Sequence, residues 1–275
     1  MRRLIVVAGS LILATVAGCG GSAPTGTGLE PVQNTNVAMK AKGPALPGVY
    51  DAKTGSFSLK TGEAPEQVLA FTFGVPGLVP ISGDWDGDGV ATVGVFDERT
   101  ATFTLATANA PAAPATTFIF GVPGTVPLVG DWDGDGVDSI GVYDPASANF
   151  FLSNANSAGD TAFAFNYGGP GMRPIAGDWD GDGKDTVGIY APETSTFFLA
   201  ATNGPGDAAL TFTFGGPNLQ PLTGDYDGDG RESIGVYDAK SGTFFLSNRN
   251  SAGNADVTVT FGVAGLAPVV GRWSK

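Results

Sequence analysis

The sequence predicts an all-β protein, a five-bladed β-propeller with four antiparallel strands in each blade. Three observations support this. The segment Gly-Asp-Trp-Asp-Gly-Asp-Gly at Gly83 returns at Gly130 and Gly177, and with Tyr for Trp at Gly224, always 47 residues further on. Short β-branched or aromatic segments alternate with Gly, Pro, Asp and Asn, which is typical of strands and turns. The two ends of the chain carry complementary fragments of one further repeat.

The second repeat illustrates how each unit is built. Its strand-like segments cover residues 126–132, 139–144, 149–153 and 161–166. Four strands in about 47 residues is the size of a propeller blade. The alternating Phe150 and Leu152 recur in every repeat, and their side chains lie on one face of the blade, where they can pack on the next blade.

The chain ends predict how the ring closes. The first repeat fragment begins at a second strand, residues 48–51, and the last fragment stops just after a first strand, residues 267–273. We therefore expect the N-terminal fragment to supply three strands of the last blade and the C-terminal fragment to supply the fourth. This pairing removes exposed edge strands, whereas an open superhelical array has no reason to divide one repeat between its termini.

Each recurrent segment places three Asp residues at alternate positions and then a Gly. Such a loop can wrap carboxylate oxygens around a hard cation, and the Gly permits the sharp turn that brings a later carbonyl round. We predict four calcium sites. Their carboxylates come from Asp84, Asp86, Asp88; Asp131, Asp133, Asp135; Asp178, Asp180, Asp182; and Asp225, Asp227, Asp229. In the fifth repeat Arg272 replaces the first Asp, so no site is expected there.

These loops and their period resemble the FG-GAP or VCBS-type repeat, whose Asp-x-Asp-x-Asp-Gly loop binds calcium and whose repeats form propeller blades. Counting from the first Asp, position 7 would add a backbone carbonyl, and position 9 would add a hydroxyl that binds weakly or through water, where the FG-GAP pattern commonly has Asp. The position 7 residues are Val90, Val137, Lys184 and Arg231, and the position 9 residues are Thr92, Ser139, Thr186 and Ser233. Position 8 holds Asp138, Asp185 and Glu232 but Ala91 in the first loop, so we expect the first site to be the weakest.

The loops have two other interpretations. An EF-hand needs flanking helices and a bidentate Glu at position 12, but position 12 is aliphatic here, at Val95, Val142, Ile189 and Val236. The loops could also be Asp-rich hairpin turns without metal, because Asp-Gly favours turns. Repulsion among three carboxylates in one turn, four times over, argues against that.

The same loops explain most of the negative net charge of the chain. The formal net charge is -13, but twelve of the 27 acidic residues belong to the four triplets. Four divalent ions would leave about -5, so the acidity indicates a metal requirement and makes nucleic acid an improbable partner. The absence of His removes imidazole as a base, nucleophile or zinc ligand.

The N-terminus predicts export and lipid attachment. Arg2 and Arg3 precede an apolar run over residues 4–17, which is too short to span a membrane and is typical of a signal peptide. The following Val-Ala-Gly-Cys resembles a bacterial lipobox, which implies cleavage after residue 18 and lipidation of Cys19; the alternative is ordinary secretion with a chance Cys. Residues 19–47 form a small, polar tether, and residues 48–275 form the propeller. We expect a monomer in the cell envelope, anchored to a membrane by lipid and facing away from the cytoplasm.

The expected function is non-catalytic binding of a protein or glycan, or scaffolding. One alternative is a multivalent lectin with equivalent sites around the ring. Another is a glycan hydrolase or lyase, which needs two carboxylates in a pocket. The candidates outside the loops are Asp97, Glu98, Asp144, Glu193 and Asp238, all in turns where solvated charge is the simpler explanation. For Trp85, Trp132 and Trp179 we expect core packing rather than sugar stacking.

Overall fold

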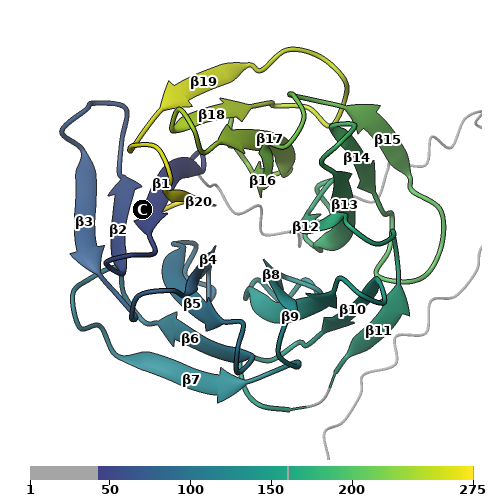
Figure 1. Ribbon diagram of the computed structural model, residues 1–275, viewed down its shortest axis with the longest axis horizontal. Coiled ribbons are helices and arrows are strands. Elements are labelled where there is room, and N and C mark those ends of the chain that lie inside the picture. The colour runs from purple at the N-terminus through teal and green to yellow at the C-terminus, as the bar shows by residue number, and fades with distance from the viewer. Residues whose placement is uncertain (1–42, 160, 275) are drawn as a thin grey trace, which may run out of the picture. The chain divides into compact units, whose positions relative to one another are not determined.

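The computed structural model describes residues 43–159 and 161–274, which form an all-β ring of five four-stranded antiparallel sheets around a central axis (Figure 1). The predicted signal peptide, Cys19 and most of the predicted tether lie outside the described residues. No helix capable of crossing a membrane occurs within those two ranges.

Blades are numbered here from the first complete one. Blade 1 comprises β4 (Val79–Gly83), β5 (Thr92–Asp97), β6 (Thr102–Ala106) and β7 (Ala115–Ile119). Blade 2 comprises β8 (Val126–Gly130), β9 (Ser139–Asp144), β10 (Asn149–Leu152) and β11 (Phe163–Asn166). Blade 3 comprises β12 (Arg173–Gly177), β13 (Thr186–Ala191), β14 (Thr196–Leu199) and β15 (Leu210–Thr213). Blade 4 comprises β16 (Gln220–Gly224), β17 (Ser233–Asp238), β18 (Thr243–Leu246) and β19 (Val257–Thr260).

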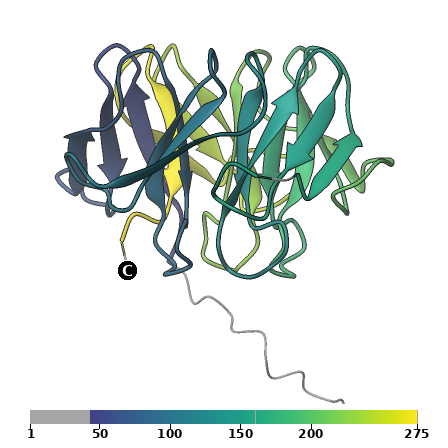
Figure 2. The ribbon, with the colours of Figure 1, turned by 90° about the horizontal axis from the view of Figure 1, so that it is seen from below.

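Blade 5 joins the two ends of the described chain, as predicted. Its strand order is β20 (Ala267–Gly271), β1 (Leu46–Asp51), β2 (Ser56–Lys60) and β3 (Val68–Thr72). The antiparallel register pairs Gly48 with Val269 and Leu46 with Gly271. Figure 2 shows β20, in yellow, beside the purple strands of the N-terminal fragment, where it pairs with β1. β1 begins at Leu46, so the sheet takes in two residues of the segment assigned above to the tether.

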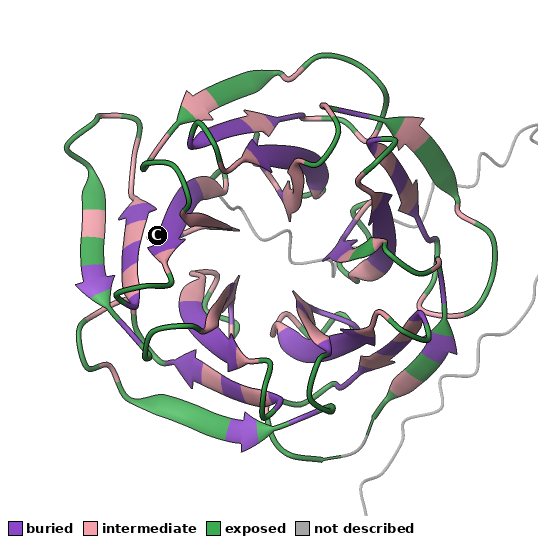
Figure 3. Cartoon of the chain, in the orientation of Figure 1, coloured by how far each residue is buried: buried purple, intermediate pink, exposed green. Residues whose placement is uncertain are grey.

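The hydrophobic core lies between adjacent blades. The aromatic residue of each second strand packs on the Phe of the third strand; Tyr143 and Phe150, for example, are both fully buried with ring centroids 4.8 Å apart. Phe57 and Leu59 of blade 5 share a cluster with Val93 and Val95 of blade 1. The Phe-x-Leu motif therefore packs on the neighbouring blade, as the alternation predicts. The outer strands are mostly exposed (Figure 3).

Candidate metal loops on one face of the ring

The four Asp triplets each lie in the loop between the first and second strands of blades 1 to 4. Loop 1 follows β4, loop 2 follows β8, loop 3 follows β12 and loop 4 follows β16. Within every triplet one carboxylate oxygen from each Asp lies within 4.8 Å of the others. The first Asp of loops 1 to 3 is buried and the other two are exposed. The structure thus gathers the carboxylates that the spacing predicted.

Loop 2 shows what holds the triplet together. Oδ1 of Asp131 accepts the N–H groups of Gly134 at 2.8 Å and Asp135 at 3.1 Å, and its Oδ2 accepts that of Gly136 at 2.8 Å. Gly134 and Gly136 have φ values of 80° and 92°, a conformation that favours Gly. Asp178 and Asp225 make the same three bonds in loops 3 and 4. Asp84 Oδ2 accepts Gly89 N–H at 2.7 Å in loop 1.

The electrostatics of the loops fit a cation. Burial raises the pKa of Asp178 and of Asp225 above the usual range, even though backbone N–H groups, three at Asp178 and two at Asp225, oppose that shift. Neighbouring carboxylates, Asp182 for the former and Asp229 and Asp227 for the latter, add to the rise. A divalent ion would offset both the burial and the repulsion. Oxygen donors alone, without nitrogen or sulfur, suit Ca²⁺ or Mg²⁺ rather than zinc.

Positions 7 and 9 have defined roles in the chain itself. The N–H of each position 7 residue donates to the third Asp of its loop, at 2.8 Å for Val137 and Arg231. The position 9 hydroxyls of Thr92 and Thr186 donate to the carbonyls of Ala106, the last residue of β6, and Ala200, which follows β14, at 2.8 and 2.9 Å. Those hydroxyls therefore help to join strands, and metal ligation by positions 7 and 9 stays a prediction.

Position 8 connects each loop to the preceding blade. Asp185 donates its N–H to the carbonyl of Asp131 at 2.8 Å, and its carboxylate accepts the Asp131 N–H at 2.9 Å. Asp138 and Asp84 are joined in the same way, at 2.9 and 2.6 Å. We call this pair of bonds the inter-blade clasp. Burial, together with the Glu232 and Asp138 carboxylates, raises the pKa of Asp185 well above its usual range.

The direction of the clasp determines which loop receives no carboxylate from position 8. The sequence-based expectation that loop 1 is weakest assumed that position 8 serves its own loop, but the contact runs to the preceding one. Loops 1 and 2 receive carboxylates from Asp138 and Asp185. In loop 3, Glu232 donates its N–H to the Asp178 carbonyl at 2.9 Å. In loop 4, the N–H of Ala45 donates to the Asp225 carbonyl at 2.7 Å. Ala45 has no carboxylate, so the second bond of the clasp cannot form there.

A repeated Asn was missed in the sequence analysis. The hairpin between the third and fourth strands carries an Asn whose Nδ2 donates to the carbonyl of the position 8 residue. These bonds run from Asn109 to Ala91, Asn156 to Asp138, Asn203 to Asp185 and Asn250 to Glu232, at 2.7 to 2.9 Å. The recurrence of Asn every 47 residues was the available signal. The contacts also place these hairpins and the metal loops on one face of the ring.

The carboxylates considered for catalysis lie at turns, and the Trp residues considered for sugar stacking lie against the core. The carboxylates of Asp97, Asp144 and Asp238 accept the N–H two residues on, at 2.9 to 3.0 Å, and so fix the turns between second and third strands. Glu98 and Glu193 are exposed. Trp132 is buried, and Trp85 and Trp179 are partly buried against the core clusters, which agrees with a packing role.

Comparisons with known proteins identify no family for this chain. No protein-family model matches the chain, and no curated protein matches it in sequence. Among solved structures, the chain is similar to a lectin of Agrocybe aegerita that specifically recognises non-reducing terminal N-acetylglucosamine. The identity is 17%, the TM-score is 0.41, and the alignment covers 78% of this chain and 65% of that chain. This likeness carries no argument about ligands, and the assignment of five blades rests on the strand topology.

Proposed function

We propose that this chain is a calcium-stabilised, non-catalytic β-propeller that binds a protein or glycan on its surface. The observation that supports it most directly is the set of four triplets, each already folded around the first Asp. Asp84, Asp86 and Asp88, and their counterparts in loops 2 to 4, would hold one ion each. The calcium would neutralise the carboxylates and fix the loops. The resemblance of the loops to the FG-GAP pattern supports the choice of calcium.

The binding role is supported by the loops and hairpins that the blades place together on one face of the ring. Each metal loop lies beside the hairpin of its own blade, and the recurring Asn fixes the two together. Metal binding would therefore order the loops that border a ligand on this face. A multivalent lectin is a special case of this proposal, in which several blades carry equivalent sites.

The predicted location is part of the same proposal. The arginine pair, the short apolar run and Cys19 support a lipid anchor in a bacterial cell envelope, outside the cytoplasm. Calcium there can reach the level needed by extracellular modules, for which Kd values of about 10⁻⁴ to 10⁻³ M are usual. Metabolic labelling with a radioactive fatty acid tests the anchor: Cys19→Ser should abolish the label, and a label that persists contradicts it.

Calcium titration tests the metal sites. Equilibrium dialysis of the full chain should give four ions, and Asp131→Asn combined with Asp133→Asn should remove one. At tenfold Kd each occupied site should add about 1.4 kcal/mol to the free energy of unfolding. A melting transition that is the same in calcium and in chelator contradicts the proposal.

A glycan array and a pull-down from envelope extract, each with calcium and with chelator, test the binding role. The lectin case predicts an avidity that falls stepwise as individual blades are altered. A single partner site predicts loss from one blade only. Turnover of a glycan by the calcium-loaded chain would contradict the non-catalytic assignment.

A further inference from the structure

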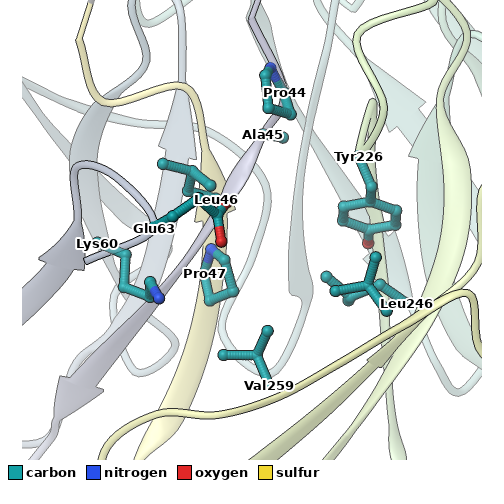
Figure 4. A pocket seen from close by; sticks show the side chains of 10 residues that line it. Pro44, Ala45, Leu46, Pro47, Lys60, Glu63, Tyr226, Leu246 and Val259 are labelled. Carbon is teal, nitrogen blue, oxygen red and sulfur yellow. The ribbon is translucent and has the colours of Figure 1, made fainter. Parts of the chain in front are cut away.

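A cavity of about 80 Å³ lies at the junction between blades 4 and 5. One wall comes from Leu46 and Pro47 of blade 5, and the opposite wall comes from Tyr226 and Leu246 of blade 4 (Figure 4). A single water-sized probe occupies about 10–15 Å³, so the cavity has room for several waters or for a small apolar group.

The cavity exists where two large side chains of the repeat are replaced by smaller ones. Tyr226 stands where the other repeats have Trp, at positions 85, 132, 179 and 273. Val259 stands where they have Phe71, Phe118, Phe165 and Phe212, each of which stacks on the third-strand Phe with centroids 5.5 to 5.8 Å apart. In blade 4, Phe244 is paired with Val259 and has no such ring opposite it. Both replacements remove volume from the same junction.

Two charged residues at this cavity also depart from the repeat. Lys60 stands where the other repeats have Ala106, Ser153, Ala200 and Ser247, and Glu63 stands where they have the clamping Asn. A Glu carboxylate cannot donate the hydrogen bond that Asn gives to the position 8 carbonyl. The exchange therefore gives up a structural bond made in the other four blades. No ion pair joins Lys60 to Glu63 in the described chain.

The junction of blades 4 and 5 also lacks an acid at position 8, where Ala45 stands. In the junction between blades 2 and 3, the Asp185 carboxylate lies close to the last Gly of the first strand, 2.8 Å from where a Gly130 Cβ would stand. At the junction of blades 4 and 5 all three nearest neighbours of the corresponding Gly224 position are carbon atoms, of Val270 at 2.9 Å, Tyr226 at 3.0 Å and Ala45 at 3.3 Å. Ala45, which also lines the cavity, thus adds an apolar group where the junction of blades 2 and 3 has a carboxylate, and the charged side chains of the lining are Lys60, at the end of β2, and Glu63, just after it.

We propose that this cavity binds a free α-amino acid with an apolar side chain. The ligand side chain lies between Pro47 and the blade 4 wall of Tyr226 and Val259. Its carboxylate pairs with Lys60 and its ammonium group pairs with Glu63. Two opposite charges beside an apolar cavity match a zwitterion with an apolar body better than they match a fatty acid or an amine, because either of those leaves one protein charge without a partner.

The test uses L-leucine as the probe and isothermal titration of the full chain at constant saturating calcium, so that failure here is independent of the metal loops. We expect saturable binding of one leucine per chain. N-acetyl-L-leucine, which lacks the ammonium group, and isoamylamine, which lacks the carboxylate, should each bind about tenfold more weakly. Glycine should not bind measurably, since it has no apolar side chain.

Variants that restore the repeat residues locate the site. Tyr226→Trp with Val259→Phe should fill the cavity and abolish leucine binding. Glu63→Asn, which introduces the residue found in the other four blades, should weaken binding about tenfold and leave the fold intact even if the filled variant misfolds. Trp179→Tyr, the same aromatic exchange at the junction of blades 3 and 4, is the matched control and should leave leucine binding unchanged.

Several results would overturn the proposal. Absence of saturable binding would show that the cavity only reflects the way the ring is closed. Equal affinities for leucine, N-acetyl-leucine and isoamylamine would show that the charges take no part. Leucine binding that survives both the filled variant and Glu63→Asn would place the site elsewhere.

Discussion

The carboxylate of Asp185 accepts the backbone N–H of Asp131, although the two residues belong to adjacent blades. Since Asp131 also holds its own loop together through three backbone N–H groups, the clasp couples the shape of loop 2 to the position of blade 3. Loops 2 and 3 are therefore in direct contact through the backbone and the carboxylate of Asp185.

Replacing Asp185 should therefore weaken the preceding loop. Asp185→Ala leaves the Asp131 N–H without its acceptor, which should lower the free energy of unfolding by about 1–3 kcal/mol. In amide NMR spectra of the calcium-loaded protein, the signal of Gly136 in loop 2 should shift more than that of Gly183 in loop 3. The reverse order would show that position 8 serves its own loop after all.

Loop 4 should be the last to bind calcium. Its first Asp faces Ala45, so it lacks the carboxylate that supports loops 1 and 2, and loss of such outer contacts commonly weakens metal affinity at least tenfold. The amides of Gly89, Gly136, Gly183 and Gly230 report the four loops separately during a calcium titration. Ala45→Asp should move the Gly230 midpoint toward the others. Saturation of loop 1 after loop 4 would contradict this order.

The sequence predicted the ring, the division of one blade between the chain ends and the triplets, because each depends on spacing along one repeat. It did not predict the clasp, because Asp185 and Asp131 are brought together only when neighbouring blades pack. For the same reason, the sequence alone does not show that the replacements at Tyr226 and Val259 lie at one junction. The structure places them with Lys60 and Glu63, from the opposite end of the chain, around one cavity.

The recurring Asn should contribute measurably to stability. Asn203 donates to the Asp185 carbonyl at 2.8 Å and accepts the Val187 N–H at 3.0 Å, so Asn203→Ala leaves two backbone groups without partners. A loss of about 1–3 kcal/mol is expected from urea unfolding in saturating calcium. Thr202→Ala, at the adjacent exposed position, is the control and should change stability little. Equal stability of both variants would mean that water replaces the Asn.

The carboxylate of Asp238, in a turn outside the metal loops, should make the stability of the protein depend on pH. Hydrogen bonds from the Ser241 hydroxyl and the Lys240 N–H hold the pKa of Asp238 below its usual range. Because the folded pKa is lower than the unfolded value of about 3.9, the stabilisation is fully present above that value and is lost as the pH falls through the folded pKa. The difference in Tm between the natural chain and Asp238→Ala should thus be constant from about pH 5 to 7 and shrink below about pH 4. Glu193→Ala is the control, since Glu193 is an exposed carboxylate in a turn of blade 3. A Tm difference for Asp238→Ala that grows as the solution is acidified would show that the carboxylate does not stabilise this turn.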